Sequence, residues 1–232
     1  MSQPISNLIL VGGIFHDFER SALALTDILA PLGVHSNIEC DLESGLASLE
    51  HRPVDLLTIN ALRWEMVGEK YDPYRVKEAY CPSAAARRRI LQHVQKGGAL
   101  LGLHTASICF SDWPEWETLL GGKWVWGTSW HPQPDTIEVT LQPGKLLDHL
   151  NSFNVTDELY TDLSVSSDAT ILASGRCERV VDPQPLIWSH TFGNGRVVYN
   201  ALGHDHESLN HPEHAEALRC VVRWALDMEK KQ

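Results

Sequence analysis

Short apolar runs alternate with stretches of helical spacing over the first half of the chain. Wholly apolar runs bounded by glycine, proline or polar residues predict strands, and apolar residues three or four apart predict helices. The expected strands cover residues 8–11, 34–40, 55–60 and 99–104, and the expected helices cover residues 20–32, 41–49 and 83–96. Strands without polar positions are typical of a sheet that is covered on both faces. The pattern therefore predicts an α/β fold, a doubly wound, mostly parallel sheet with helices on both faces.

After residue 104 the pattern changes to alternating strands and tight turns. Helices are expected at residues 113–120 and 212–230, a half-exposed strand at 136–141, and a hairpin of 186–190 with 196–200 around Gly193-Asn194-Gly195. No stretch resembles a linker, so we expect one domain over residues 1–232.

One aromatic-rich segment, residues 63–82, shows neither the apolar spacing of a helix nor that of a strand. It is long for a connection within a compact domain, and connections of this length are often lids or binding loops. An ordered surface excursion or a contact in a homo-oligomer is an equally good interpretation.

Composition and charge limit the kinds of partner that the protein is expected to bind. Lysine and arginine number 19 against 30 aspartates and glutamates, which gives a net charge of −11. Such a surface repels a phosphate backbone, so we expect no nucleic-acid partner. The chain has no apolar run of membrane-spanning length and no basic leader before its short apolar start at residues 8–11, and its five cysteines form no CxxC pair. We therefore expect a cytoplasmic protein with reduced thiols and no membrane partner.

Candidate chemistry lies where predicted strands end, because ligands of doubly wound sheets bind beyond the carboxyl ends of the strands. Gly12-Gly13 with His16, then Asn60, then His104 follow three such strands and are expected to share one crevice. His104 enters a run of small residues, as a nucleophile does in a strand-to-helix elbow. Cys109 lies five residues beyond His104 and is too distant to act as the nucleophile of this elbow. The alternative interpretation of His104 is a buried histidine whose hydrogen bonds are satisfied, without a role in catalysis.

Two further stretches stand out. Trp124, Trp126 and Trp130 would share one face of an extended segment, where they could stack on sugar rings or pack in the core. Residues 203–214 contain four histidines; His204 and His206 could form a metal pair, although no fixed metal-binding spacing is present. His214 is expected to point from the last helix into solvent.

These stretches together resemble the ThuA-like (trehalose-utilisation) family over nearly the whole chain. The matching residues are Gly12-Gly13 with His16, Gly102 to Ala106, Trp116 to Gly122 with His131, Phe153 with Asp157 to Tyr160, and Pro185 to Trp188 leading into Gly193 to Asp205. The resemblance implies a flavodoxin-like, class I glutamine-amidotransferase-like fold. The chain departs from the amidotransferase pattern at two places. His104 stands where that pattern has its cysteine nucleophile, and His204-Asp205-His206 stands where it has a His-x-Glu pair.

The resemblance implies site residues in three roles. Catalytic residues would be His104, His204 and Glu158; substrate-binding residues would be Gly13, His16, His131, Trp130, Tyr160 and Asp205; and a divalent metal, Zn or Mn, would be held by His16, His104, His131 and His204.

The function expected from these residues is acid–base chemistry on a sugar or keto-sugar, with a small carbohydrate as the partner. The runner-up is a non-catalytic carbohydrate-binding or regulatory protein on a degenerate amidotransferase-like fold. Hydrolysis of an amide or ester is a third interpretation, for which Ser107 is the nearby nucleophile.

Overall fold

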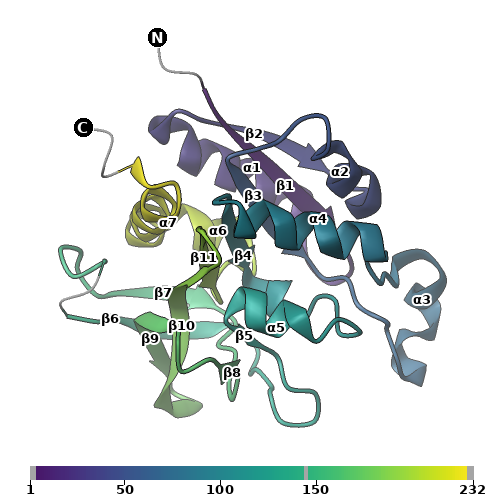
Figure 1. Cartoon of the computed structure of the whole chain (residues 1–232). Coiled ribbons are helices and arrows are strands. Elements are labelled where there is room, and N and C mark those ends of the chain that lie inside the picture. The colour runs from purple at the N-terminus through teal and green to yellow at the C-terminus, as the bar shows by residue number, and fades with distance from the viewer. Residues whose placement is uncertain (1–3, 144–145, 229–232) are drawn as a thin grey trace.

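The computed structural model describes residues 4–143 and 146–228, whose strands form a mixed sheet in the order β2-β1-β3-β4-β11-β10-β9-β6-β7 (Figure 1). The strands are β1 (Ile5–Gly12), β2 (Val34–Glu39), β3 (Leu56–Ala61), β4 (Ala99–Leu103), β6 (Asp135–Leu141), β7 (Phe153–Asp157), β9 (Thr170–Cys177), β10 (Val180–Phe192) and β11 (Gly195–Asn200), and β5 (Gly122–Lys123) pairs separately with β8 (Ser164–Val165). The helices are α1 (Phe18–Leu29), α2 (Leu42–Ser48), α3 (Asp72–Glu78), α4 (Ala84–Gln95), α5 (Glu115–Leu120), α6 (His206–Asn210) and α7 (Pro212–Ala225), with 3-10 turns η1 (Ala30–Leu32), η2 (Glu69–Tyr71) and η3 (His104–Ser107).

Strands β2, β1, β3, β4 and β11 are parallel, and the strands from β10 to β7 continue the sheet in antiparallel pairs. Helix α1 packs with α6 and α7, whereas α2 packs with α4, so helices cover both faces of the parallel part (Figure 1). Every residue of β3 and β4 is buried, as their mostly apolar runs predict, and the polar Thr58 and Asn60 of β3 are buried with the rest. The predicted fold class is confirmed.

Two element predictions need correction. The segment 63–82 is not without regular structure, since it contains η2 and α3. Helix α3 has no buried residue, so it carries no apolar face from which a period could be detected. The last helix ends at Ala225, and the predicted end at Lys230 lies outside the described residues.

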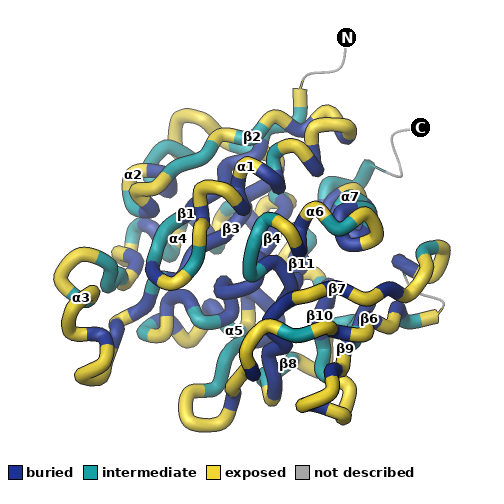
Figure 2. The backbone as a smooth tube through the Cα atoms, turned by 180° about the vertical axis from the view of Figure 1, so that it is seen from behind, coloured by how far each residue is buried: buried dark blue, intermediate teal, exposed yellow. Residues whose placement is uncertain are grey.

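Half of the eight tryptophans pack in the core. Trp64, Trp113, Trp116 and Trp188 are buried. The indole nitrogen of Trp116 donates to the Ala106 carbonyl, and that of Trp188 donates to the Leu120 carbonyl, both at 2.9 Å. The buried stretches of the tube in Figure 2 follow the central strands. Among the described residues, no helix is both long and apolar enough to cross a membrane.

The parallel strands also position the candidate site. Strands β1, β4 and β11 run side by side or nearly so in one direction, so the segments after Gly12, Leu103 and Asn200 emerge at the same edge of the sheet. The segment after β7 reaches this edge from the antiparallel part, because the Asp157 carboxylate accepts from the backbone N–H groups of Gly203 and His204.

Candidate metal centre and adjoining pocket

Three histidines and one glutamate from four distant segments meet at this edge. His16 follows β1, His104 follows β4, Glu158 follows β7 and His204 follows β11. One ligand atom from each of the four lies within 4.8 Å of the others. We call these four residues the His/Glu cluster.

His104 is held rigidly at the start of η3. Its φ of 44° is in the left-handed region, which a histidine adopts only at a tight turn, and the neighbouring small residues permit that turn. Its Nδ1–H donates to the Ala201 carbonyl at 2.6 Å, which leaves Nε2 with its lone pair free. Nε2 lies 3.1 Å from the Tyr160 hydroxyl oxygen and 3.3 Å from Glu158 Oε2. The elbow-like turn expected around His104 is therefore present, with an imidazole in place of a nucleophile.

His16 is oriented in the same manner. Its Nδ1–H donates to the Ile14 carbonyl at 3.2 Å, and Nε2 is buried without a hydrogen-bond partner, 3.9 Å from Glu158 Oε2. Burial, reinforced by the neighbouring His104, lowers the pKa of His16 to about 3. His16 is thus a neutral imidazole near neutral pH, with an unused lone pair aimed at the cluster.

His204 supplies a second unpartnered nitrogen. Its Nδ1 is buried and lies 3.3 Å from Glu158 Oε2, without the alignment of a hydrogen bond. The contact with Glu158 raises the pKa of His204 above its ordinary value.

Glu158 is the centre of the group. Its side chain is only 10% exposed and lies within 4 Å of the imidazoles of His16, His104, His131 and His204. Burial alone would raise the pKa of this carboxyl, but the contacts with His104 and His204 outweigh it and hold the pKa well below its usual range. The cluster therefore combines a carboxylate with three imidazoles, of which those of His16 and His104 are fixed by backbone carbonyls.

This donor set fits a divalent metal. Neutral imidazole and carboxylate are ligands that Zn and Mn accept, and backbone carbonyls commonly orient ligating histidines through the other ring nitrogen. A bound cation would also give partners to His16 Nε2 and His204 Nδ1, two buried atoms that otherwise have none. The fourth histidine expected among the ligands, His131, lies farther out: its Nδ1–H donates to the Pro132 carbonyl and lies 3.6 Å from Glu158 Oε1.

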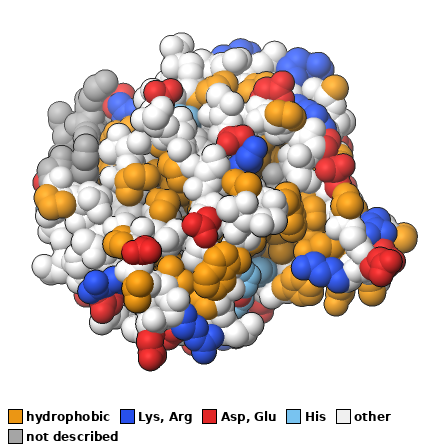
Figure 3. All heavy atoms as spheres, turned by 90° about the horizontal axis from the view of Figure 1, so that it is seen from below, with side chains coloured by type: hydrophobic (Ala, Val, Ile, Leu, Met, Phe, Trp, Pro, Cys, Tyr) orange, Lys and Arg blue, Asp and Glu red, His pale blue; other side chains and the backbone are white. Residues whose placement is uncertain are grey.

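A pocket of about 320 Å³ opens over the cluster. His16, His131, Glu158, Tyr160 and His204 form its polar lining. Aromatic side chains, among them Trp64, Trp124 and Trp126, form much of the rest. Figure 3 shows histidine side chains in a hollow that is flanked by hydrophobic ones.

Three residues expected in substrate binding are not among those that line the pocket. Gly13 has a φ of 131°, and a Cβ there would lie 2.4 Å from the Leu62 carbonyl oxygen, so its small size allows the chain to pass the loop after β3. Asp205 caps α6 by accepting from the Ser208 N–H. Trp130 is 47% exposed and is not among the residues that line the pocket. Asn60 also turns away from the crevice, since its side-chain amide donates to Ser21 beneath α1.

Asp157 is part of the family match, but it is not among the site residues expected from the sequence. This residue is 1% exposed, and its carboxylate accepts from the N–H groups of Gly203 and His204 and from the Ser208 hydroxyl. It therefore holds the loop that carries His204 beside Glu158. The available signal was a carboxylate at an inward position of the alternating strand β7, whose burial pattern places Phe153, Val155 and Asp157 on one side.

The prediction for His214 was wrong. Its side chain is completely buried; Nδ1–H donates to the Ser208 carbonyl, and Nε2 accepts from the Asn200 amide at 2.7 Å. The residue lies on the buried face of α7 and links this helix to Asn200 at the end of β11.

Neither alternative nucleophile is placed for acyl transfer. Cys109 is buried, its thiol donates to the Ala61 carbonyl, and burial raises its pKa to about 12. Ser107 is also buried, and its hydroxyl lies 2.9 Å from that of Tyr199, which donates to it.

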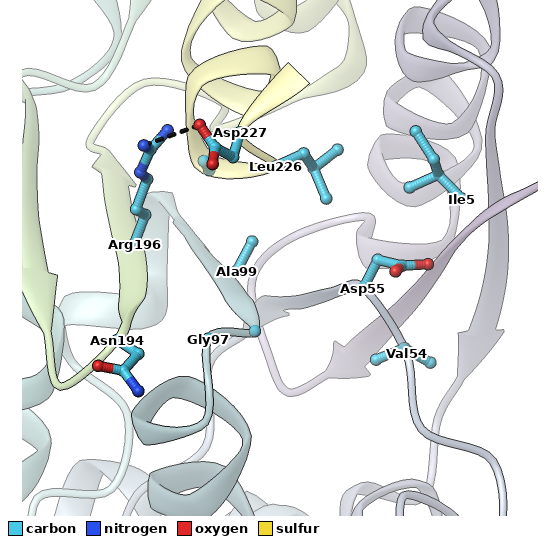
Figure 4. A pocket seen from close by; sticks show the side chains of 11 residues that line it. Ile5, Val54, Asp55, Gly97, Ala99, Asn194, Arg196, Leu226 and Asp227 are labelled. Carbon is cyan, nitrogen blue, oxygen red and sulfur yellow. Dashed lines mark hydrogen bonds and ion pairs between the residues drawn. The ribbon is translucent and has the colours of Figure 1, made fainter. Parts of the chain in front are cut away.

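A larger cavity of about 550 Å³ lies at the opposite, amino end of the parallel strands (Figure 4). Its charged side chains are already paired: Arg196 with Asp227, and Asp55 with the backbone and hydroxyl of Ser6. The His/Glu cluster is therefore the better candidate site, although its pocket is smaller.

Comparison with solved structures agrees with the fold described above. A ThuA-like protein from Parabacteroides merdae superposes with a TM-score of 0.75 at 19% identity, over 97% of this chain and 90% of that one. A ThuA-like protein from Bacteroides uniformis gives 0.68 at 21% identity, over 96% and 91%. A glutamine amidotransferase from Thermotoga maritima gives 0.53 at 11% identity, over 97% and 100%, which confirms the amidotransferase-like fold. No protein of curated function matches the sequence.

The family model described as "Trehalose utilisation" matches residues 72–225, which is most of the chain and includes three members of the His/Glu cluster. The chain therefore belongs to the ThuA family.

Proposed function

We propose that the protein is a divalent-metal-dependent enzyme that acts on a sugar or keto-sugar. Membership of the ThuA family suggests a role related to trehalose utilisation. The observation that carries the finer proposal is the His/Glu cluster, in which two buried imidazole nitrogens point at a common centre without partners. Such atoms are costly unless a ligand satisfies them.

The cluster would hold the metal through His16, His104, Glu158 and His204. When bound, the metal would act as a Lewis acid toward oxygens of the substrate. A keto-sugar suits this chemistry because the protons next to its carbonyl are acidic, and their removal places negative charge on the carbonyl oxygen.

Two other pocket residues would handle protons. His131 lines the pocket beside Glu158 and is one-third exposed, so its imidazole can exchange protons with substrate and solvent. Tyr160 is completely buried, and burial raises its pKa well above the ordinary value, so it acts as a neutral hydrogen-bond donor. We assign His131 as the acid–base group and Tyr160, whose hydroxyl lies 3.1 Å from His104 Nε2, as a hydrogen-bond donor beside the metal site.

Chelation tests the proposal. The untagged protein is assayed against a panel of methyl keto-glucosides that differ in the position of the ketone, before and after metal removal and after addition of Zn or Mn. We expect turnover of at least one member, its loss on chelation, and its return with one of the two metals. Turnover that survives complete metal removal would contradict the metal's role. Binding without turnover by metal-loaded protein would favour the carbohydrate-binding alternative.

A further inference from the structure

The pocket over the His/Glu cluster has two chemically different ends. One end is lined by three members of the cluster, His16, Glu158 and His204, together with His131 and Tyr160. The other end is built from Leu62, Ile108 and a set of aromatic rings. These rings belong to Phe15, Trp64, Tyr71, Trp124 and Trp126.

The aromatic rings form a continuous wall that begins at the cluster. Trp124 packs edge-on against Tyr160 with ring centroids 5.1 Å apart, and Trp126 follows at 6.5 Å from Trp124. Trp126 in turn lies 6.0 Å from Trp64, which packs edge-on against Tyr71 at 5.0 Å. Trp64 is 3% exposed whereas Trp126 is 49% exposed, so Trp126 offers a free surface while Trp64 supports it from behind.

This outer end offers mainly aromatic faces. Among the described residues that line it, Lys70 carries the only charged group, and its ammonium lies 4.7 Å from the centroid of the Tyr71 ring. A second sugar ring can stack on such faces, but its many hydroxyls would find fewer partners there than in water, and an unpaired buried hydroxyl is costly. A flat apolar ring loses nothing of this kind and gains contact with aromatic surfaces.

We propose that the pocket is selective for glycosides with an aromatic aglycone. The inference rests on the proposed function in one respect, which is that the sugar ring occupies the polar end beside the cluster. The aglycone then lies along Trp124 and Trp126, with Trp64 behind them. A phenyl glycoside is expected to bind more tightly than a disaccharide such as trehalose, because a phenyl ring has no hydroxyls to desolvate against the aromatic wall.

Calorimetric titration with three probes tests the selectivity: phenyl β-glucoside, methyl β-glucoside and trehalose. We expect the phenyl glucoside to bind at least about tenfold more tightly than either of the others, since it buries a whole ring of apolar surface. Equal affinity for the phenyl and methyl glucosides, tighter binding of trehalose, or binding of none of the three would overturn the inference.

Two matched variants locate the effect. Trp126→Ala removes a half-exposed indole that lines the pocket, and Trp130→Ala removes one of nearly equal exposure, 47% against 49%, that does not line it. We expect Trp126→Ala to weaken phenyl glucoside binding by about tenfold and methyl glucoside binding by much less, and Trp130→Ala to change neither. An equal loss for both glucosides in Trp126→Ala, or a loss in Trp130→Ala as large as in Trp126→Ala, would contradict this placement.

Binding and turnover separate this inference from the proposed function. A phenyl preference in a protein that turns over no keto-glucoside would leave the aromatic subsite standing and refute the enzymatic proposal. Turnover of keto-glucosides with no preference for an aromatic aglycone would support the enzymatic proposal and refute the aromatic subsite.

Discussion

Replacing Glu158 by glutamine is expected to lower the affinity for divalent metal by at least about a hundredfold and to abolish metal-dependent turnover. The carboxylate is the one anionic member of the His/Glu cluster, and each imidazole of the cluster contacts it. Glutamine keeps the size and shape of the side chain but removes the charge that attracts a cation. Metal affinity is measured by competition with a chelating indicator.

Glu207→Gln is the matched control for this variant, because Glu207 is exposed on α6 and lies outside the cluster. Its metal affinity is expected to equal that of the wild type. Circular dichroism of both variants shows whether the fold is retained. An unchanged metal affinity in folded Glu158→Gln would mean that the carboxylate is not a ligand.

Asp157→Asn is expected to destabilise the protein by about 3 kcal/mol, measured by urea unfolding. The buried carboxylate accepts from two backbone N–H groups and the Ser208 hydroxyl, and an asparagine amide would turn its own N–H groups toward some of these donors. Because two of the donors belong to Gly203 and His204, the loop that carries His204 should also be displaced. The Asp157→Asn variant is therefore also expected to bind divalent metal more weakly, even without urea, where the protein is still folded.

Asp205→Asn is the natural control for that variant. Asp205 also accepts from a backbone N–H, as the cap of α6, but asparagine caps helices as well as aspartate does. Its unfolding free energy should stay within about 0.5 kcal/mol of the wild type. If Asp157→Asn proved equally mild, the buried carboxylate would not be the support of the His204 loop.

The sequence predicted the parallel half of the fold well because its elements are defined locally. The run of β4 is wholly apolar and that of β3 is interrupted only by Thr58 and Asn60, and burial on both faces is typical of such runs. His16 and His104 could be placed at one edge for the same reason, since each follows a strand of the predicted parallel sheet. Helix α3 could not be predicted, because a short helix without buried residues has no apolar period.

The remainder of the site depends on contacts between distant segments. The central position of Glu158 follows from the course of the antiparallel strand β7, which no local pattern specifies. His214 looks like a surface residue until the packing of α7 brings it to Asn200. Trp130 alternates with Trp124 and Trp126 in the sequence, but the chain turns between Val125 and Ser129, so the three rings do not share one face. Spacing alone cannot show such a turn.

The most direct test of the account is the metal content of the purified, untagged protein, compared between wild type, His204→Ala and His206→Ala. Both histidines are half-buried and close in sequence, but only His204 belongs to the cluster. The account predicts close to one divalent metal ion per chain in the wild type and His206→Ala, and a severe loss in His204→Ala. Wild-type protein that contains no metal, and takes up neither Zn nor Mn when these are supplied, would contradict it.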